Sequence, residues 1–243
     1  MAAGIAAGLL AVPATGFAQE KPAAADSHDD VNDPLESMNR AIFSFNMALD
    51  KAILRPIAIG YRAVLPAPVR ESATNFLDNL ESPVILLNDL LQGKPGRAGQ
   101  TVSRFGINTV IGFLGFFDPA ESMGIERHDE DFAQTMGAWG VSSGPYLVLP
   151  LLGPLPPRDT LGFAVDIFSD PLTYMLWDHR AAGIAYYSAD VVDQRHQVID
   201  QLDELEKSSV DYYATIRSLY SQHMNSKIRD GETDIENLPD FGD

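Results

Sequence analysis

The chain has 243 residues, of which 45% are hydrophobic and 21% charged, a composition that is typical of a globular protein and excludes a disordered one. Its formal net charge of −17 argues against free nucleic acid as a partner, because a phosphate backbone is bound by basic surfaces. The absence of cysteine excludes disulfides, thiolate chemistry and cysteine-ligated metals, and it argues against lipid attachment through a cysteine at the mature N-terminus.

The first eighteen residues predict an export signal. Residues 5–12 form a small apolar run, and Gly16-Phe17-Ala18 is a small-x-small cleavage site directly before Gln19. No lysine or arginine precedes the apolar run, although a signal peptide normally has one there. We expect residues 1–18 to be a signal peptide and residues 19–31, rich in alanine and aspartate, to be a flexible leader.

Helical periodicity begins after the leader. Asn32-Asp33-Pro34 is typical of a helix start, with a polar cap followed by proline in the first turn. Apolar side chains then recur every three or four residues, which predicts a helix over residues 35–53 that Arg55-Pro56 breaks. Three more helices are expected, over residues 57–64, 69–80 and 83–91.

Two apolar runs follow, over residues 107–117 and 146–155. Both are shorter than the roughly 20 residues of a membrane-spanning helix, since a helix of about 11 residues covers only about 16 Å. Runs of this length suit either insertion into one leaflet of a bilayer or burial in an ordinary core. The first run and its flanks contain glycines at positions 106, 112, 115 and 124, which predict a bent apolar hairpin over about 105–124.

The last third of the chain has one apolar stripe, which predicts a single long helix from Ser188 to about Lys227. Packing onto the rest of the domain is the favoured interpretation, and a coiled-coil partner is the alternative. Residues 228–243 are expected to form an acidic, mobile tail. Sustained period-two alternation is absent from the sequence, so we predict one mainly α-helical domain over residues 32–227. The stripe recurs at intervals of seven: Val191, Val198, Leu205, Tyr212 and Leu219.

The catalytic and metal-binding patterns in the sequence are weak. The stretch from Gly140 to Gly144 satisfies G-x-S-x-G, the nucleophile elbow of lipases, but no hydrophobic strand precedes it and Pro145 follows it. A turn is the favoured interpretation, and a lipid hydrolase built on Ser142 is the minor alternative. Two acidic clusters lack the spacing of known metal-binding loops, so we predict neither enzyme activity nor a cofactor or metal. These clusters are residues 126–131 with His128, and Asp26, Asp29, Asp30 and Asp33 near His28.

Many short motifs follow one another in a fixed order from Asn32 onward: Asn32-Asp33-Pro34-Leu35-Glu36, Phe45-Asn46, Arg55-Pro56, Tyr61-Arg62, Asn75-Phe76, Leu91-Gln92-Gly93, Arg104-Phe105, Asn108-Thr109, Asp131-Phe132, Trp139-Gly140-Val141, Gly144-Pro145-Tyr146 and Arg158-Asp159. In these motifs the sequence closely resembles the MlaA family, also called VacJ, of the system that maintains outer-membrane lipid asymmetry in Gram-negative bacteria. The resemblance is dense over about residues 32–175 and looser over the C-terminal helices.

The resemblance implies a ring of helices in the inner leaflet of the outer membrane, on its periplasmic side, around an amphipathic channel. Phospholipid misplaced in the outer leaflet would pass through this channel to a soluble periplasmic lipid-carrier protein. Family members also associate with outer-membrane porin trimers. Many of them are lipoproteins anchored through an N-terminal cysteine, which this sequence lacks. The alternative is an adaptor that bridges porin and carrier without a channel of its own.

Two groups of residues are the candidates for contact with lipid. The hairpin is predicted to border the lipid path and to control passage by its mobility, through Phe105, Asn108, Gly112, Gly115, Phe116, Asp118 and Gly124. Residues 40–104 have eight Lys or Arg against five Asp or Glu, the one net basic stretch of an acidic chain. Three arginines there adjoin apolar or aromatic residues and are predicted to contact headgroup phosphates, with carboxylate pairing as the alternative for each. They are Arg55, Arg62 and Arg104.

Overall fold

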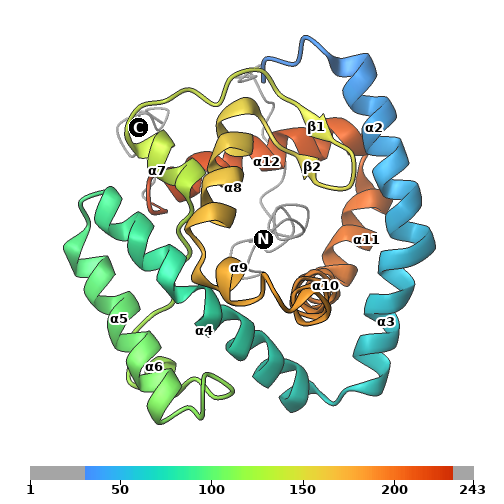
Figure 1. Cartoon of the computed structure of the whole chain (residues 1–243). Helices are drawn as coiled ribbons and strands as arrows, with labels where there is room; N and C mark the ends of the chain where they lie inside the picture. Colours follow the sequence, from blue (N-terminus) through green and yellow to red (C-terminus); the bar gives the residue numbers. More distant parts are fainter. Residues whose placement is uncertain (1–30, 232–243) are drawn as a thin grey trace, which may run out of the picture.

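The computed structural model describes residues 31–231, which fold almost entirely into helices. Figure 1 shows these helices arranged as a ring that the C-terminal helices close. The predicted α-helical class and ring-like arrangement are therefore confirmed. The predicted signal peptide, the leader up to residue 30 with its cluster around His28, and the acidic tail from residue 232 lie outside the described residues.

A curved rod forms one side of the ring. It consists of α2 (Glu36–Leu49), a π-helical turn η1 (Asp50–Leu54) and α3 (Arg55–Val64), which follow one another without a break (Figure 1). The prediction that Arg55-Pro56 ends the helix is wrong. The Arg55 N–H donates to the carbonyl of Asp50, five residues earlier, and this wider turn accommodates the proline that follows.

The next side of the ring is α4 (Ala67–Leu91), which packs along α5 (Pro95–Val110). Two separate helices were predicted here, and this is wrong because α4 continues through Pro83. A proline inside a helix removes one backbone hydrogen bond and costs about 3 kcal/mol. Leu77 and Val84, on either side of the proline, are both buried, so packing against neighbouring elements offsets this cost.

After α5 the chain turns sharply over residues 111–117 and returns through the short helix α6 (Pro119–Ser122). The first apolar run therefore ends a helix and forms a loop, and its tip faces outward: Phe113 and Leu114 are 68% and 57% exposed. Their φ angles of 54° and 61° are left-handed, a conformation that costs a residue with a side chain about 1–2 kcal/mol. The predicted hairpin is thus a helix, a strained tip and a helical turn.

Two helices that follow the hairpin pack closely against each other, and the first of them contacts α4. They are α7 (Phe132–Ala138) and α8 (Pro157–Ser169), and the short helix α9 (Pro171–Met175) follows them. Gly162 of α8 permits this close approach, because a Cβ there would lie 2.4 Å from the backbone nitrogen of Ala133. A larger residue at position 162 would therefore push the two helices apart.

The second apolar run forms a small β-hairpin between α7 and α8. Its strands, β1 (Val148–Leu149) and β2 (Gly153–Pro154), pair antiparallel. Tyr146 and Leu155 at its two ends are 2% and 0% exposed, so this run belongs to the core. Of the two alternatives for runs of this length, burial in a core is the one that the structure shows here.

The predicted long C-terminal helix is three helices, α10 (Arg180–Gln197), α11 (Ile199–Ser208) and α12 (Tyr212–Ile228). The chain leaves helical geometry at Val198 and again at residues 209–211, where the Asp211 carboxylate caps α12 by accepting from the Ala214 N–H. The packing role holds for part of the stripe, since Val198 belongs to one buried cluster and the partly buried Leu205 and Tyr212 pack against it. This cluster contains Tyr146, Val148, Val198, Leu202, Tyr213, Ile216 and Tyr220.

The ring closes where α2, η1 and α3 meet the C-terminal helices. At one end of this seam, Phe43 packs against the rings of Tyr212 and Tyr213, with centroids 5.7 and 5.5 Å away. Ion pairs join the rest of the seam, and because most of them are partly exposed, each contributes little by itself. They are Arg40–Asp211, Asp50–Arg195, Lys51–Glu206, Arg55–Asp203 and Arg62–Asp200.

Asn39 ties α2 to the β-hairpin from a fully buried position. Its side-chain nitrogen donates to the Tyr146 carbonyl at 3.0 Å and to the Asp33 carboxylate at 2.8 Å. Its side-chain oxygen accepts from the Val148 N–H at 3.0 Å. One amide therefore satisfies two backbone groups that would otherwise be buried without partners.

We predict that Asn39→Leu lowers the free energy of unfolding by about 3 kcal/mol, because each buried polar group left unpaired costs roughly 1–3 kcal/mol. Denaturant unfolding of the purified protein measures the change. Asn225→Leu, at an exposed position of α12, is the matched control and should leave the midpoint in place. Equal midpoints for wild type and Asn39→Leu would contradict this role.

Candidate functional site

The ring surrounds a cavity of about 530 Å³. Its wall is built from α4, the loop of residues 127–131, α7, α8, α10 and α12. Apolar side chains such as Leu77, Val84 and Phe163 line it together with many carboxylates. The wall is therefore amphipathic, so one cavity offers surface to both an apolar chain and a charged group.

Asp166 is the best-defined buried carboxylate of this wall. It lies on α8, is 5% exposed, and accepts from the Phe132 N–H at 3.0 Å and the Asn88 side chain at 3.2 Å. Thr135 extends the network by donating to Asn88 at 2.8 Å. Burial, followed by the charge of Asp131, raises the pKa of Asp166 to about 7, because both disfavour the ionised form.

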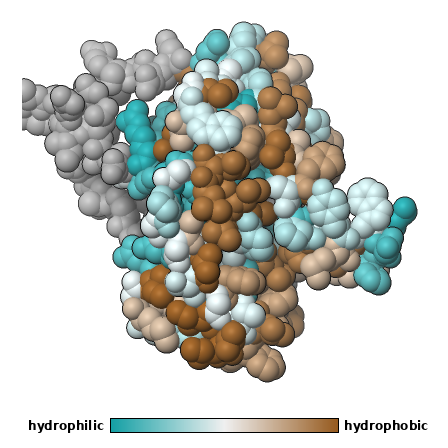
Figure 2. All heavy atoms as spheres, turned by 60° about the vertical axis from the view of Figure 1, so that its left-hand side comes forward, coloured by the Kyte–Doolittle hydropathy of each residue, from teal (hydrophilic) through white to brown (hydrophobic). Residues whose placement is uncertain are grey.

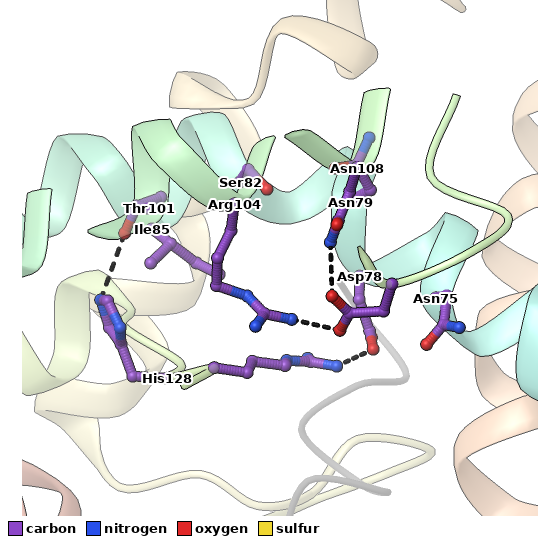
Figure 3. A pocket seen from close by; sticks show the side chains of 11 residues that line it. Asn75, Asp78, Asn79, Ser82, Ile85, Thr101, Arg104, Asn108 and His128 are labelled. Atoms are coloured by element: carbon purple, nitrogen blue, oxygen red, sulfur yellow. Dashed lines mark hydrogen bonds and ion pairs between the residues drawn. The ribbon is translucent and has the colours of Figure 1, made fainter. Parts of the chain in front are cut away.

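A second, small polar pocket adjoins the cavity and shares Asp78, Ile85, Arg127 and His128 with it. Figure 3 shows the side chains of Arg104 and Asn108 pointing into this pocket. Both donate to the carboxylate of Asp118, Asn108 at 2.9 Å. His128 lies against Thr101, with its Nε2 3.2 Å from the hydroxyl. The pocket is a dense hydrogen-bonded junction between α4, α5 and the hairpin.

The predicted hairpin residues lie in different surroundings, and two of them anchor the hairpin. Asn108 and Asp118 form the anchor, since Asn108 also accepts from the Ala120 N–H at 3.1 Å and Asp118 caps α6. Phe116 stacks on Phe76 of α4 with 4.8 Å between the ring centroids. Phe105 and Gly124 are exposed and do not contribute to the anchor. None of the seven residues lines the 530 Å³ cavity, so their role in the lipid path stays a prediction.

Two glycines set how closely the hairpin lies on its neighbours. A Cβ on Gly112 would meet the backbone oxygen of Phe117 at 2.2 Å, and a Cβ on Gly115 would meet the side chain of Asn79 at 2.5 Å. Gly115 also has a φ of 93°, which residues with a side chain rarely adopt. These glycines therefore permit both the sharp turn and the close approach of the backbone that glycine was expected to allow.

Each of the three predicted headgroup arginines has a carboxylate partner. Arg55 pairs with Asp203, Arg62 with Asp200, and Arg104 with Asp118. Arg55 and Arg62 belong to the seam that closes the ring, and Arg104 lies in the small polar pocket. The pairing that was the alternative for each residue is therefore what the structure shows, and a phosphate contact stays a prediction.

Large apolar side chains are exposed on the surface of the described residues. Figure 2 shows hydrophobic residues extending from the top to the bottom of the face on the α5 side. Within residues 31–231, no helix is both long and apolar enough to cross a membrane. Strongly exposed apolar side chains include, around the hairpin, Val110, Ile111, Phe113 and Phe117, and from α8 to the start of α10, Leu161, Phe168, Met175, Trp177 and Ile184.

The remaining chemical motifs take ordinary positions. Residues 140–144 form a loop between α7 and β1, so the strand-turn-helix geometry of a nucleophile elbow is not formed around Ser142. His128 is held by Asp89, with Nε2 3.0 Å from one carboxylate oxygen. Residues 31–231 contain no group of three or more His, Cys, Asp or Glu placed to hold a metal ion.

Sequence reasoning missed the C-terminal part of the cavity wall. Polar side chains of α10 recur at intervals of three and four and face the cavity, although a polar helix face is normally assigned to solvent. The spacing itself is visible in the sequence, but it does not reveal that the ring turns this face inward. These side chains are Asp190, Asp193, Gln194 and Gln197.

We predict that Gly115→Ala loosens the hairpin, because the new Cβ collides with Asn79. Hydrogen–deuterium exchange should become faster at the amides that close the turn, namely the Gly115 N–H bonded to Asn108 and the Phe117 N–H bonded to Gly112. Gly124→Ala is the control: its φ of 78° is similar but no atom lies within 4 Å of its Cβ. If both variants speed exchange equally, the left-handed backbone and not the collision with Asn79 would be the cause of the loosening.

We predict that Asp166→Asn flattens the dependence of stability on pH between about 4 and 7. The raised pKa means that folded protein holds a proton that the unfolded chain has released, so this group favours folding at low pH. Its contribution is lost as the pH rises through about 7, at no more than about 1.4 kcal/mol per pH unit. Unfolding midpoints across this range measure the slope. Glu71→Gln, which changes an exposed carboxylate of α4, is the control and should keep the wild-type slope.

Comparisons with known proteins agree with this architecture. A family model described as MlaA lipoprotein matches residues 31–227. A protein of Rickettsia felis whose function is uncharacterised is 35% identical over 201 residues, which cover 82% of this chain and 79% of that protein. The intermembrane phospholipid transport system lipoprotein MlaA of Escherichia coli (strain K12) is 34% identical over 212 residues, covering 86% and 83%.

Two further relatives extend the match. The protein of the same description in Haemophilus influenzae is 34% identical over 214 residues, covering 86% of this chain and 85% of that protein. A solved structure from work on the "Structural basis for maintenance of bacterial outer membrane lipid asymmetry" superposes with a TM-score of 0.72 at 34% identity. It covers 81% of this chain and 98% of that chain. The chain therefore belongs to the MlaA family.

Proposed function

We propose that this protein transports phospholipid at the outer membrane of the Gram-negative envelope and thereby maintains its lipid asymmetry. Phospholipid misplaced in the outer leaflet enters the ring, passes through its cavity and is handed to a periplasmic lipid-carrier protein. The observation that carries the proposal is the amphipathic cavity of about 530 Å³ inside a helical ring of this family. The relatives in Escherichia coli and Haemophilus influenzae are described as components of an intermembrane phospholipid transport system.

Membrane residence in the inner leaflet is part of this proposal. The exposed apolar side chains of the hairpin tip and of α8 and α9 support it, because burying each large apolar side chain contributes roughly 1.5–3 kcal/mol. A protein with such an outer surface needs no spanning helix to stay in one leaflet. Association with an outer-membrane porin trimer would cover part of the same surface.

The hairpin and the arginines have supporting roles in the proposal. The hairpin borders the path next to the small polar pocket, which shares four residues with the cavity, and its movement admits lipid. Arg104 reaches into that pocket and is the best placed of the three arginines to meet a phosphate. Neither role requires a chemical reaction, a cofactor or a metal.

We predict that a bulky group attached inside the cavity stops transport. The sequence has no cysteine, so a single cysteine introduced by Met224→Cys in the cavity wall is labelled specifically. In cells that carry this variant, a reversible thiosulfonate reagent should raise the amount of phospholipid that added phospholipase cleaves at the cell surface. A reducing agent should restore the original amount.

Val210→Cys provides the matched control, because Val210 is fully exposed between α11 and α12 and lies outside the cavity wall. Labelling it should leave surface phospholipid unchanged. If labelling at position 224 is complete and surface phospholipid does not rise, lipid does not use this cavity and an adaptor role becomes the better explanation.

A further inference from the structure

The cavity wall has a strong excess of negative charge. Nine carboxylate side chains line it, against Arg127, Lys227 and two histidines. Arg127 is already paired, with Asp78 and Asp129. Inside a cavity of low dielectric constant, such an excess repels an anion and attracts a cation far more than it would in water. The charge of the wall therefore bears on which phospholipid headgroup it accepts.

One acidic and one basic side chain of this wall are unused by the protein. Glu81 of α4 and Lys227 of α12 both line the cavity and are only partly exposed. Within the described chain, neither side chain makes a hydrogen bond or an ion pair, although most other ionisable groups of the wall do. Ionising a partly buried group without a partner is costly, which points to a ligand that supplies the opposite charge.

The surroundings of Glu81 favour a cation beside it. Burial, and then the negative charges of Asp190 and Asp129, raise its pKa to about 8, while Lys227 acts in the opposite direction. A positive group next to Glu81 would relieve this repulsion. Gln134, which is 1% exposed and lines the same cavity, adds a side-chain oxygen that accepts no hydrogen bond within residues 31–231.

We propose that the cavity selects phospholipids with a zwitterionic, amine-bearing headgroup, as in phosphatidylethanolamine, over anionic ones such as phosphatidylglycerol. The headgroup ammonium donates to Glu81, and the phosphate accepts from Lys227. This inference rests on the proposed function and names the substrate class of its cavity. A zwitterionic headgroup has one group of opposite charge for each of these two side chains, and its zero net charge avoids repulsion by the rest of the wall.

Lipid captured from mixed vesicles tests the proposal. The purified full-length protein is incubated with vesicles of phosphatidylethanolamine and phosphatidylglycerol in equal amounts, re-isolated, and its bound lipids are quantified by mass spectrometry. Wild type should hold phosphatidylethanolamine in about tenfold excess, the ratio that one charge-assisted hydrogen bond supports. Glu81→Gln should reduce this excess clearly, with the total lipid maintained, although the eight remaining carboxylates of the wall still disfavour the anionic lipid.

The control variants separate the role of Glu81 from general effects of charge. Glu71→Gln removes an exposed carboxylate of the same helix that lies outside the cavity and should keep the tenfold excess. Lys227→Gln should lower the capture of both lipids without changing their ratio, because both contain a phosphate. Melting temperatures of all variants verify that each one is folded.

Several outcomes would overturn the proposal. Equal capture of both lipids by wild type would mean that the cavity does not select the headgroup, and an unchanged excess in Glu81→Gln would mean that Glu81 does not bind the headgroup amine, while the proposed transport function would still stand in both cases. Wild type that captures no lipid at all would contradict that function as well. Displacement of bound lipid by an equal concentration of free phosphoethanolamine would reassign the two groups to a soluble ligand.

Discussion

Closure of the ring is the constraint on which the rest of the structure depends. The wall of the cavity comes from both halves of the chain, so in an open ring the helices that form this wall would no longer face one another. The rod of α2, η1 and α3 closes it by packing on α10, α11 and α12. Buried contacts at one end, around Asn39 and Phe43, fix the register of this seam, and the ion pairs that follow hold the remaining length without a continuous apolar core.

Closure also explains how charge is distributed. In an ordinary globular protein the apolar faces of the helices point inward and the charged faces outward. Here the carboxylates of α10 line the internal cavity, while many large apolar residues remain outside. The basic residues of the first half largely neutralise acids across the seam, as Arg55 does with Asp203, and this leaves the excess of acids for the interior.

The sequence predicted the helical class, the family and the packing stripe of the C-terminal helices, because each rests on local periodicity or on many ordered motifs. It did not predict the continuity of α4 through Pro83 or the breaks around α11. At Pro83 the local signal that ends a helix is overridden by the burial of Leu77 and Val84. At the end of α11 the Asp211 carboxylate caps the next helix, α12, so that a new helix begins there.

The candidate site was predicted less well than the fold. Asn108 and Asp118 do meet, but as an anchor next to the small pocket. The cavity wall draws on elements up to about 150 residues apart, for example Glu81 and Lys227, and nothing local in the sequence brings such positions together. A charged residue that faces a cavity has the same sequence neighbours as one that faces solvent, so only the closed ring distinguishes them.

The strained tip at Phe113 and Leu114 has a practical consequence for handling the protein. Both residues combine a left-handed backbone with a largely exposed apolar side chain, so the properties that favour membrane attachment and those that reduce stability coincide at two positions. Asparagine or glycine at these positions would relieve backbone strain and also remove exposed apolar surface. The tip is therefore a natural starting point for engineering a detergent-free form whose ring and cavity are unchanged.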